Sequence, residues 1–376
     1  MIELPKRVHE HALTLTPDQL PVRVYDLPRL DARGRALRDS LPPSVELYFS
    51  LHDPPPGAVS ALARHASGFE VVSADGLGAV RRERPAARAA LRGPGKTREE
   101  ITAAVAAGNA ALHVDSPEEL RLILLAARYA GRGVDVLLRV DPPEGSGGGT
   151  AAAPVGMDPA ALVECAEILD GSTLVRPLGF STGTADRPDA RTLGRLAKEM
   201  LDALRPWSSM FGIARPQYAI VGGAPAPGAG RWSTGFDWRQ YGSLLSRLAA
   251  PGETLRVTPS GPPEPCCGWF LTRVLDVKHH YGRALAVVAG GEWIGDAAPG
   301  DVAVVPLETG WDRPWPRPEL AAEPVTVTCR DTGAERVLAN DVPVDLLRVG
   351  DAVAFPATFT TPAAPGPPPG VHTLTA

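Results

Sequence analysis

The chain has 376 residues, 44% of them hydrophobic, and a formal net charge of −5. At roughly 150 residues per domain, this length indicates two or three domains, or one large barrel with a companion domain. The composition is typical of a soluble globular protein, no apolar run approaches the ~20 residues of a membrane span, and the N-terminus lacks an export signal. Because no basic stripe is present, nucleic acid is disfavoured as a partner. We therefore expect a cytoplasmic protein that binds small molecules or other proteins.

Between residues 45 and 258, short β-rich runs alternate with helical patterns. The predicted strands are 45–51, 69–74, 89–91, 111–115, 134–140, 174–180, 218–221 and 255–258. The predicted helices between them include 97–107, 117–129, 158–169, 191–204 and 238–248. Two of these helices begin with a hydroxyl residue followed three positions later by Glu, at Thr97 and Ser116, which is the pattern of a capping box. About eight β/α units in succession predict a TIM-type (β/α)8 barrel; a doubly wound sheet is the alternative.

After residue 259 the pattern changes to strands without helices. The predicted strands are 269–278, 283–288, 302–305, 325–329 and 351–355, which together indicate an all-β domain. An N-terminal strand at 13–25 is expected to complete this domain, and the proline-rich stretch 362–370 is expected to be irregular. The predicted organisation is therefore 1–26 joining the β-domain, 27–258 as barrel, and 259–376 as the all-β domain with its tail.

Short phrases distributed along nearly the whole chain carry a resemblance to a known family. They stand at 24–27, 47–51, 68–73, 93–97, 113–120, 137–140 and 272–278. In this order, with a barrel followed by a β-domain, the chain resembles the fold type III pyridoxal-phosphate (PLP) decarboxylases, the ornithine/diaminopimelate decarboxylase family. Later phrases at 337–342 and 347–351 look closest to the branch found in siderophore-type gene clusters. The resemblance implies an alanine racemase/ornithine decarboxylase-like fold, PLP held as a lysine imine, and a head-to-tail dimer.

The family's imine-forming lysine has no equivalent in this chain. The first barrel strand reads Tyr48-Phe49-Ser50-Leu51-His52, so His52, or Leu51 if the sequences are aligned one residue earlier, stands at the lysine position. Neither side chain carries the primary amine that an imine requires. The four lysines of the chain are not placed to substitute for it; they are Lys6, Lys96, Lys198 and Lys278.

Other anchors that the resemblance implies are also changed. Ser181 stands where the family has a ring-stacking histidine, Thr258 where a glutamate pairs with the pyridine nitrogen, and 356–361 where a Gly-Ala-Tyr phrase closes the phosphate site. A hydroxyl cannot keep the pyridine nitrogen protonated as a carboxylate does. What remains is a vestigial cofactor pocket of Glu70, Arg139, Gly222, Gly223 and Thr258. In a purely structural interpretation, Glu70 and Arg139 pair with each other inside the barrel.

A new catalytic constellation would have to come from few residues. The candidates are His52, Asp53, Ser181, Cys329 and Asp331. His52 and Asp53 at the barrel mouth could act as a general base or contribute to a metal site, although neighbours in a strand point to opposite faces. Cys329 and Asp331 resemble the family's loop that reaches the partner subunit's site; in the simpler interpretation Cys329 is a packed strand residue. No metal site is predicted.

Three functions remain open from the sequence. The first is a pseudoenzyme that has lost covalent PLP and acts as a homodimer or as a heterodimer with an active paralogue or pathway enzyme. The second is a PLP-independent enzyme of natural-product biosynthesis that uses a small-molecule ligand in the barrel. The third is a decarboxylase-like enzyme that holds PLP without a covalent bond. No bound cofactor is predicted, and neither nucleic acid nor a membrane is expected as a partner.

Overall fold

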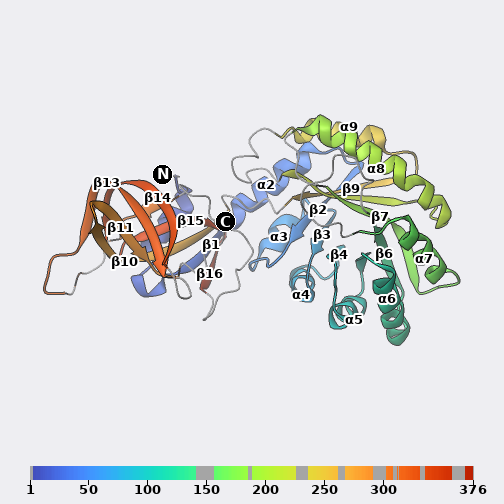
Figure 1. Ribbon diagram of the computed structural model, residues 1–376, viewed down its shortest axis with the longest axis horizontal. Helices are drawn as coiled ribbons and strands as arrows, with labels where there is room; N and C mark the ends of the chain where they lie inside the picture. Colours follow the sequence, from blue (N-terminus) through green and yellow to red (C-terminus); the bar gives the residue numbers. More distant parts are fainter. Residues whose placement is uncertain are drawn as a thin grey trace. The chain divides into compact units, whose positions relative to one another are not determined.

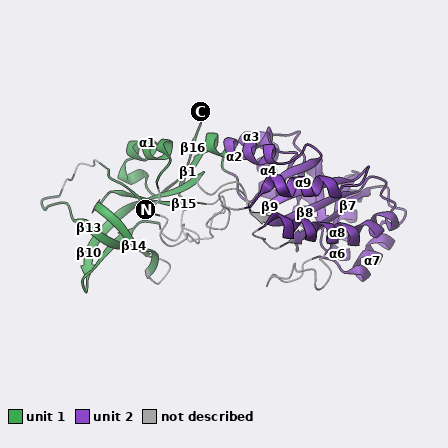
Figure 2. Ribbon diagram, turned by 90° about the horizontal axis from the view of Figure 1, so that it is seen from above, with its two compact units in different colours: residues 1–30, 55–57, 264–376 green, residues 31–54, 58–263 purple. Residues whose placement is uncertain are grey.

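The computed structural model describes residues 3–140, 156–184, 189–225, 236–260, 267–290, 302–307, 311, 313–330, 335–357 and 369–375 (Figure 1). The chain divides into two compact units (Figure 2). The barrel unit comprises residues 31–54 and 58–263, and the β unit comprises residues 1–30, 55–57 and 264–376. Within the described part, no helix is both long and apolar enough to cross a membrane.

The barrel unit contains a closed barrel of parallel strands, which confirms the predicted fold class. Its strands, in chain order, are β2 (Val45–Leu51), β3 (Gly68–Val71), β4 (Ala89–Leu91), β5 (Ala110–Val114), β6 (Val134–Arg139), β7 (Val175–Thr184), β8 (Gln217–Pro225) and β9 (Thr254–Ser260). The helices that alternate with them are α2 (Leu27–Ser40), α3 (Ala58–Ala63), α4 (Ala74–Glu83), α5 (Arg98–Ala107), α6 (Pro117–Ala130), α7 (Pro159–Leu169), α8 (Ala190–Met210) and α9 (Trp238–Leu248). Figure 1 shows these helices outside the strands.

The two predicted capping boxes differ in the structure. At α5 both halves are present, because the Glu100 N–H donates to the Thr97 hydroxyl and the Thr97 N–H donates to the Glu100 carboxylate. At α6 the Ser116 hydroxyl accepts the Glu119 N–H. The Glu119 carboxylate, however, accepts hydrogen bonds from the Asp115 N–H and from Lys96. The Glu119 carboxylate therefore does not complete the capping box, and it pairs with Lys96 instead.

Alternation along the strands decides which side chains enter the barrel. Phe180 on β7 packs edge-on against Phe211, and the hydroxyl of Tyr218 on β8 lies 2.8 Å from that of Ser208 on α8. These side chains therefore face the helices, and the opposite parity faces inward. Residues that pair across neighbouring strands point to the same side, so the parallel register identifies the inward residues of each strand in turn. The inward positions include Tyr48, Ser50, Gly68, Glu70, Ala90, Ala111, His113, Leu137, Arg139, Gly179, Ser181, Ala219, Arg256 and Thr258.

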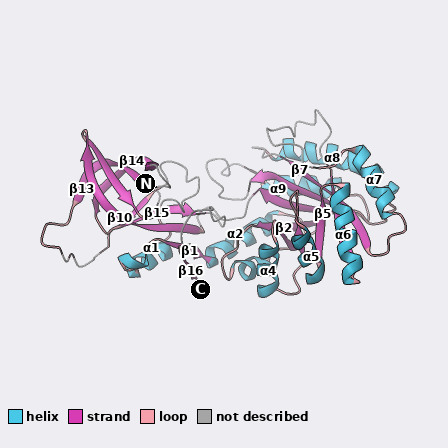
Figure 3. Cartoon of the chain, turned by 60° about the horizontal axis from the view of Figure 1, so that its bottom comes forward, coloured by secondary structure: helices cyan, strands magenta, loops and turns pink. Residues whose placement is uncertain are grey.

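The β unit is built mainly of strands (Figure 3). Its sheet has the order β12-β15-β10-β11-β13-β14, and β1 pairs with β10 and with β16. The strands are β1 (Val22–Asp26), β10 (Gly268–His280), β11 (Arg283–Val288), β12 (Ala303–Val305), β13 (Glu319–Arg330), β14 (Glu335–Arg348), β15 (Ala352–Ala357) and β16 (Gly370–Leu374). Two sequence predictions need correction here, one at each end of the chain.

The predicted N-terminal strand at 13–25 is wrong over most of its length. Helix α1 (Lys6–Thr14) occupies its start and a short 3-10 helix follows at Pro17–Gln19, so that only the part from Val22 onward is a strand. Val8 and Ala12, four residues apart, are both fully buried, which is helical rather than strand periodicity. At the other end, Gly370 begins β16, which runs parallel to β1, while residues 362–368 of the tail lie outside the described residues.

Candidate functional site

Glu70 on β3 is the centre of a charged cluster inside the barrel. Its carboxylate is fully buried and forms an ion pair with Arg256 of β9. Its second oxygen lies 3.1 Å from Nε of Arg92, which directly follows β4, and Nη2 of Arg92 donates to Ser50 Oγ at 3.0 Å. The expected pair between Glu70 and Arg139 is wrong, because Arg139 has a different partner. Two guanidinium groups therefore balance one buried carboxylate.

A second group of charges lies at the carboxyl ends of β4, β5 and β6. Arg139 Nη1 lies 3.3 Å from the Asp115 carboxylate. Lys96 Nζ donates to the carbonyl oxygen of Gly93 at 2.6 Å and to the carboxylates of Asp115 and Glu119, each at 3.0 Å. An ammonium group has three donors, and all three are used. Burial of the Lys96 ammonium is thus compensated by two carboxylates.

The interior carries a surplus of positive charge. Three carboxylates, Glu70, Asp115 and Glu119, face four cations, Arg92, Lys96, Arg139 and Arg256. Burial lowers the pKa of His113 well below its ordinary value, and the positive charges of Arg256 and Lys96 lower this pKa further. His113 is therefore neutral at pH 7, and its Nε2 is buried without a hydrogen-bond partner among the described residues.

His52 continues the inward face of β2. Tyr48 and Ser50 both enter the barrel, and alternation assigns the next inward position to His52 and the helix-facing position to Leu51, which is fully buried. Burial lowers the pKa of His52, and the nearby Arg92 lowers it further. His52 is thus a half-buried neutral imidazole at the barrel mouth. Its sequence neighbour Asp53 is exposed.

The two hydroxyl residues of the predicted pocket lie inside the barrel. Ser181 and Thr258 are each 1% exposed, and their side-chain oxygens have no hydrogen-bond partner in the described part of the chain. Gly183, two residues after Ser181, leaves room for a cation, since a Cβ there would lie 3.2 Å from Nη2 of Arg139. Gly222 and Gly223 have φ of +80° and +78°, a backbone conformation that by itself favours glycine.

The remaining candidates lie elsewhere. Cys329 on β13 is 1% exposed and packs in the hydrophobic core of the β unit, and Asp331 lies outside the described residues. Among the residues that the structure describes, no group of three His, Cys, Asp or Glu side chains is arranged to hold a metal ion. The predicted site residues that the structure brings together are therefore those of the barrel: His52, Glu70, Arg139, Ser181 and Thr258.

The other three lysines lie on outer surfaces. Lys6 is on α1 and its side chain is 87% exposed; Lys198 is on α8, 61% exposed, and paired with Asp202; Lys278 is an exposed residue of β10. Lys96 is thus the buried lysine, and its ammonium is held by three acceptors. An imine requires a neutral amine, which this arrangement opposes.

Five residues of the cluster are not among the candidates predicted from the sequence: Arg92, His113, Asp115, Glu119 and Arg256. A signal for part of this set is present. Strands of a parallel barrel are normally continuous apolar runs, so an ionisable residue within such a run stands out. The segments Ala110–Val114 and Thr254–Ser260 contain His113 and Arg256 in this way. Alternation then places both side chains inward.

Known proteins of similar sequence are decarboxylases, although no family model matches the chain. The chain is 22% identical over 360 residues to 2-[(L-alanin-3-ylcarbamoyl)methyl]-2-hydroxybutanedioate decarboxylase of Staphylococcus aureus, covering 88% of this chain and 86% of that protein. It is 27% identical over 373 residues to diaminopimelate decarboxylase of Actinosynnema pretiosum, covering 90% and 78% of the two chains.

Solved structures with the same fold extend the comparison. Diaminopimelate decarboxylase of Helicobacter pylori complexed with L-lysine has a TM-score of 0.73 at 17% identity, covering 95% of this chain and 90% of that chain. Lysine/ornithine decarboxylase of Vibrio vulnificus complexed with putrescine has a TM-score of 0.73 at 16% identity, covering 99% of each chain. The chain therefore has the fold of these PLP-dependent decarboxylases and is similar in sequence to enzymes of this kind.

Proposed function

We propose that this chain is a pseudoenzyme of its family: it does not form the lysine imine with PLP and acts as a partner subunit in a bacterial biosynthetic pathway. The observation that carries the proposal is Lys96. It is the buried lysine of the barrel unit, and its ammonium donates hydrogen bonds to Gly93, Asp115 and Glu119. Removing a proton from this group would leave two buried carboxylates without their counter-charge.

The described residues do not fit a lysine-bound PLP. The inward position at the end of β2 holds His52, whose imidazole has no primary amine. The inward position of β9 that the resemblance assigns to the pyridine nitrogen holds Thr258, whose hydroxyl is buried and unpaired among the described residues. A hydroxyl does not stabilise a pyridinium as a carboxylate does. We therefore derive no catalytic step through this cofactor.

The partner role follows from retention of the fold with an altered interior. A subunit that keeps the barrel and the β unit keeps the surfaces through which the family, as the resemblance implies, forms head-to-tail dimers. The partner role requires a heterodimer with an active paralogue or pathway enzyme; a homodimer is the other assembly that the resemblance allows. Co-expression with the decarboxylase paralogue of the same genome, followed by native mass spectrometry, tests this: a stable heterodimer supports the proposal, and homo-oligomers alone reject the partner role.

Absorbance and mass test the cofactor part. The purified protein is mixed with PLP, reduced with borohydride, and analysed by intact mass and peptide mapping. We expect no stoichiometric adduct, with only background modification at Lys6, Lys198 and Lys278. A stoichiometric adduct at Lys96 would refute the proposal. A bound PLP absorbance band without a reduced adduct would instead support non-covalent PLP.

A PLP-independent enzyme is the second candidate, and a specific observation favours it. A neutral imidazole, His52, is influenced by the charge of Arg92, and the unpaired hydroxyls of Ser181 and Thr258 lie inside the same barrel. The Staphylococcus aureus relative is by its name a decarboxylase of a substituted hydroxybutanedioate, an anion that would suit a cationic interior. Turnover of a polycarboxylate that is lost in His52→Ala would establish this candidate in place of the first. The control is His279→Ala, at an exposed histidine of β10 in the other unit, which should keep the activity.

A further inference from the structure

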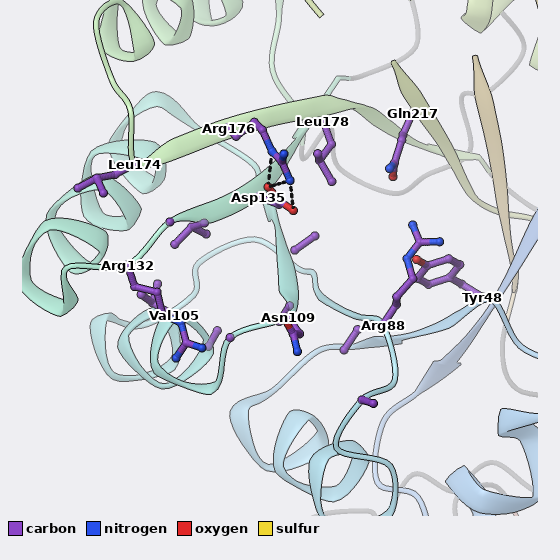
Figure 4. Close-up of a pocket in the computed structure, with 18 of the residues that line it drawn as sticks. Tyr48, Arg88, Val105, Asn109, Arg132, Asp135, Leu174, Arg176, Leu178 and Gln217 are labelled. Atoms are coloured by element: carbon purple, nitrogen blue, oxygen red, sulfur yellow. Dashed lines mark hydrogen bonds and ion pairs between the residues drawn. The ribbon is translucent and has the colours of Figure 1, made fainter. Parts of the chain in front are cut away.

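A cavity of about 820 Å³ lies at the amino-terminal end of the barrel. Its lining includes Ala89, Ala110 and Gln217, the first residues of β4, β5 and β8, together with inward-facing Tyr48 and Arg256. Figure 4 shows Tyr48 and Arg88 on one side of this space, Asn109 and Arg132 on another, and Gln217 projecting toward it. Lys96, Asp115 and Arg139 of the candidate site, by contrast, lie at the carboxyl ends of the strands.

Small residues stand at several inward positions at this end of the barrel. Barrels of this type are normally filled by layers of bulky branched side chains, but here the inward positions nearest the amino ends include Gly68, Ala111 and Gly179. A Cβ on Gly68 would lie 2.4 Å from the ring of Tyr48, and one on Gly179 would lie 2.0 Å from the carbonyl oxygen of Gln217. The two glycines therefore admit the Tyr48 ring and the Gln217 backbone, both of which line the cavity, and Ala111 lines it directly with a small side chain.

The cavity is lined predominantly by cations. Arg88, Arg132, Arg176 and Arg256 line it, against the single lining carboxylate of Asp135. Three of these arginines have carboxylate partners: Arg176 binds Asp135 at 2.8 and 2.9 Å, Arg88 binds Glu46, and Arg256 binds Glu70. Arg132 has no carboxylate partner among the described residues; its Nη1 donates to the carbonyl oxygen of Ala106 at 2.8 Å. Arg132 is exposed, so its guanidinium is accessible to a ligand that enters the cavity.

A buried polar atom also belongs to this wall. The side chain of Arg256 is 2% exposed, and its guanidinium lies 3.6 Å from the centre of the Tyr48 ring. Its Nε is buried without a hydrogen-bond acceptor in the described part of the chain. An unsatisfied donor of a buried cation is costly, and an acceptor atom of a ligand would satisfy it. The adjacent Gln217 and Asn109 supply amide groups for the same ligand.

We propose that this cavity binds a small anion bearing carboxylate or phosphate groups, with Arg132 as its charge partner. Arginine recognises both groups through paired hydrogen bonds, and the cavity volume lies within the ordinary range of small-molecule sites, roughly 300–1,000 Å³. The proposal does not rest on the proposed function, because the cavity opens at the amino-terminal end of the barrel; Arg256 is the residue that this cavity shares with the charged cluster.

Calorimetric titration with citrate and with inorganic phosphate, at constant ionic strength, tests the proposal and distinguishes the two chemistries. We expect the preferred anion to bind the full chain, and Arg132→Gln to weaken this binding about tenfold because a charged contact is lost. Ala111→Leu, which fills the cavity, should abolish binding. Arg35→Gln, at an exposed arginine of α2 that does not line the cavity, is the matched control and should leave the affinity unchanged. Arg139→Gln tests the competing site at the carboxyl end of the barrel.

Hydrogen exchange locates the bound anion independently of the variants. The anion should slow amide exchange around residues 108–111 and 132–135, and leave that of 181–183 unchanged. Absence of binding by both anions up to about 10 mM, equal affinity in Ala111→Leu and wild type, or a loss of affinity in Arg139→Gln alone would each overturn the proposal.

Discussion

Replacing Glu70 by Gln removes the carboxylate that holds two guanidinium groups inside the barrel. Arg256 is almost fully buried, whereas Arg92 is 24% exposed. Removing one partner of a buried ion pair costs roughly 3–5 kcal/mol, because the other charge is left without compensation. A partly exposed partner adds at most about 1 kcal/mol. We therefore expect Glu70→Gln to lower the free energy of unfolding by about 4 kcal/mol.

Two further variants separate this effect from a general response to losing a carboxylate. Glu46→Gln breaks the pair with Arg88, whose side chain is 49% exposed, and should cost about 1 kcal/mol or less. The double variant Glu70→Gln with Arg256→Met removes the buried cation as well as its partner. It should recover most of the lost stability, because apolar replacement of a whole buried pair is often neutral.

The assay is urea unfolding followed by far-ultraviolet circular dichroism, with hydrogen exchange of the β3 and β9 amides reporting on the barrel itself. The linear dependence of free energy on urea gives the difference between variants. If Glu70→Gln costs no more than Glu46→Gln, the interior pair does not carry the energy that its burial implies. If the double variant is less stable than the single one, the cost lies in lost packing over Tyr48 rather than in uncompensated charge.

The other predictions concern His113, Lys96 and Gly68. Because the pKa of His113 is lowered on folding, the unfolded chain binds a proton below about pH 6.5 that the folded chain does not. The free energy of unfolding should therefore fall by about 1 kcal/mol between pH 7 and 5.5. Urea unfolding at each pH measures this fall, which should be smaller in His113→Asn. Lys96→Met should cost about 3–5 kcal/mol by leaving two buried carboxylates unpaired, whereas Lys198→Met, at an exposed pair, should cost under about 1 kcal/mol; equal thermal midpoints for the two would contradict this. Gly68→Ala should cost about 1–3 kcal/mol, because its methyl group would lie 2.9 Å from the carbonyl oxygen of Arg88 as well as on the Tyr48 ring; an unchanged urea midpoint would show that the wall relaxes.

Periodicity was sufficient to predict the barrel because its strands, even the three-residue β4, are short, largely apolar runs that alternate with helical patterns. It failed where local composition opposes the structure formed. Helix α4 contains Gly76 and Gly78, which weaken a helical pattern; the structure shows the Ser73 hydroxyl accepting the Gly76 N–H at its start. Strand β16 follows a proline-rich stretch that disfavours strand, yet it pairs with β1.

The candidate site was predictable only where a single strand determines the direction of a side chain. The inward direction of His52 follows from alternation along β2 once Tyr48 is known to face inward. The partner of Glu70 did not follow, because Arg256 is 186 residues away in the sequence and meets it only when β9 closes the barrel against β2. Glu70 on β3 and Arg139 on β6 are separated by strands β4 and β5, and Arg139 pairs with Asp115, which lies on the loop after the neighbouring strand β5.

The polar side chains inside the barrel lower the stability of the fold, and their presence therefore needs another reason. A buried group of three carboxylates and four cations is not a stabilising choice, since well-packed apolar side chains of similar volume often give equal or greater stability. If the barrel served only as a scaffold for a partner, replacing these seven charged residues by apolar ones would not reduce the stability of the fold. The hydroxyls of Ser181 and Thr258 and the Nε2 of His113, buried and unpaired among the described residues, add a further cost. An acceptor or donor group of a bound molecule would remove that cost, so the polar interior argues that a subunit without the lysine imine still binds a polar ligand in its barrel.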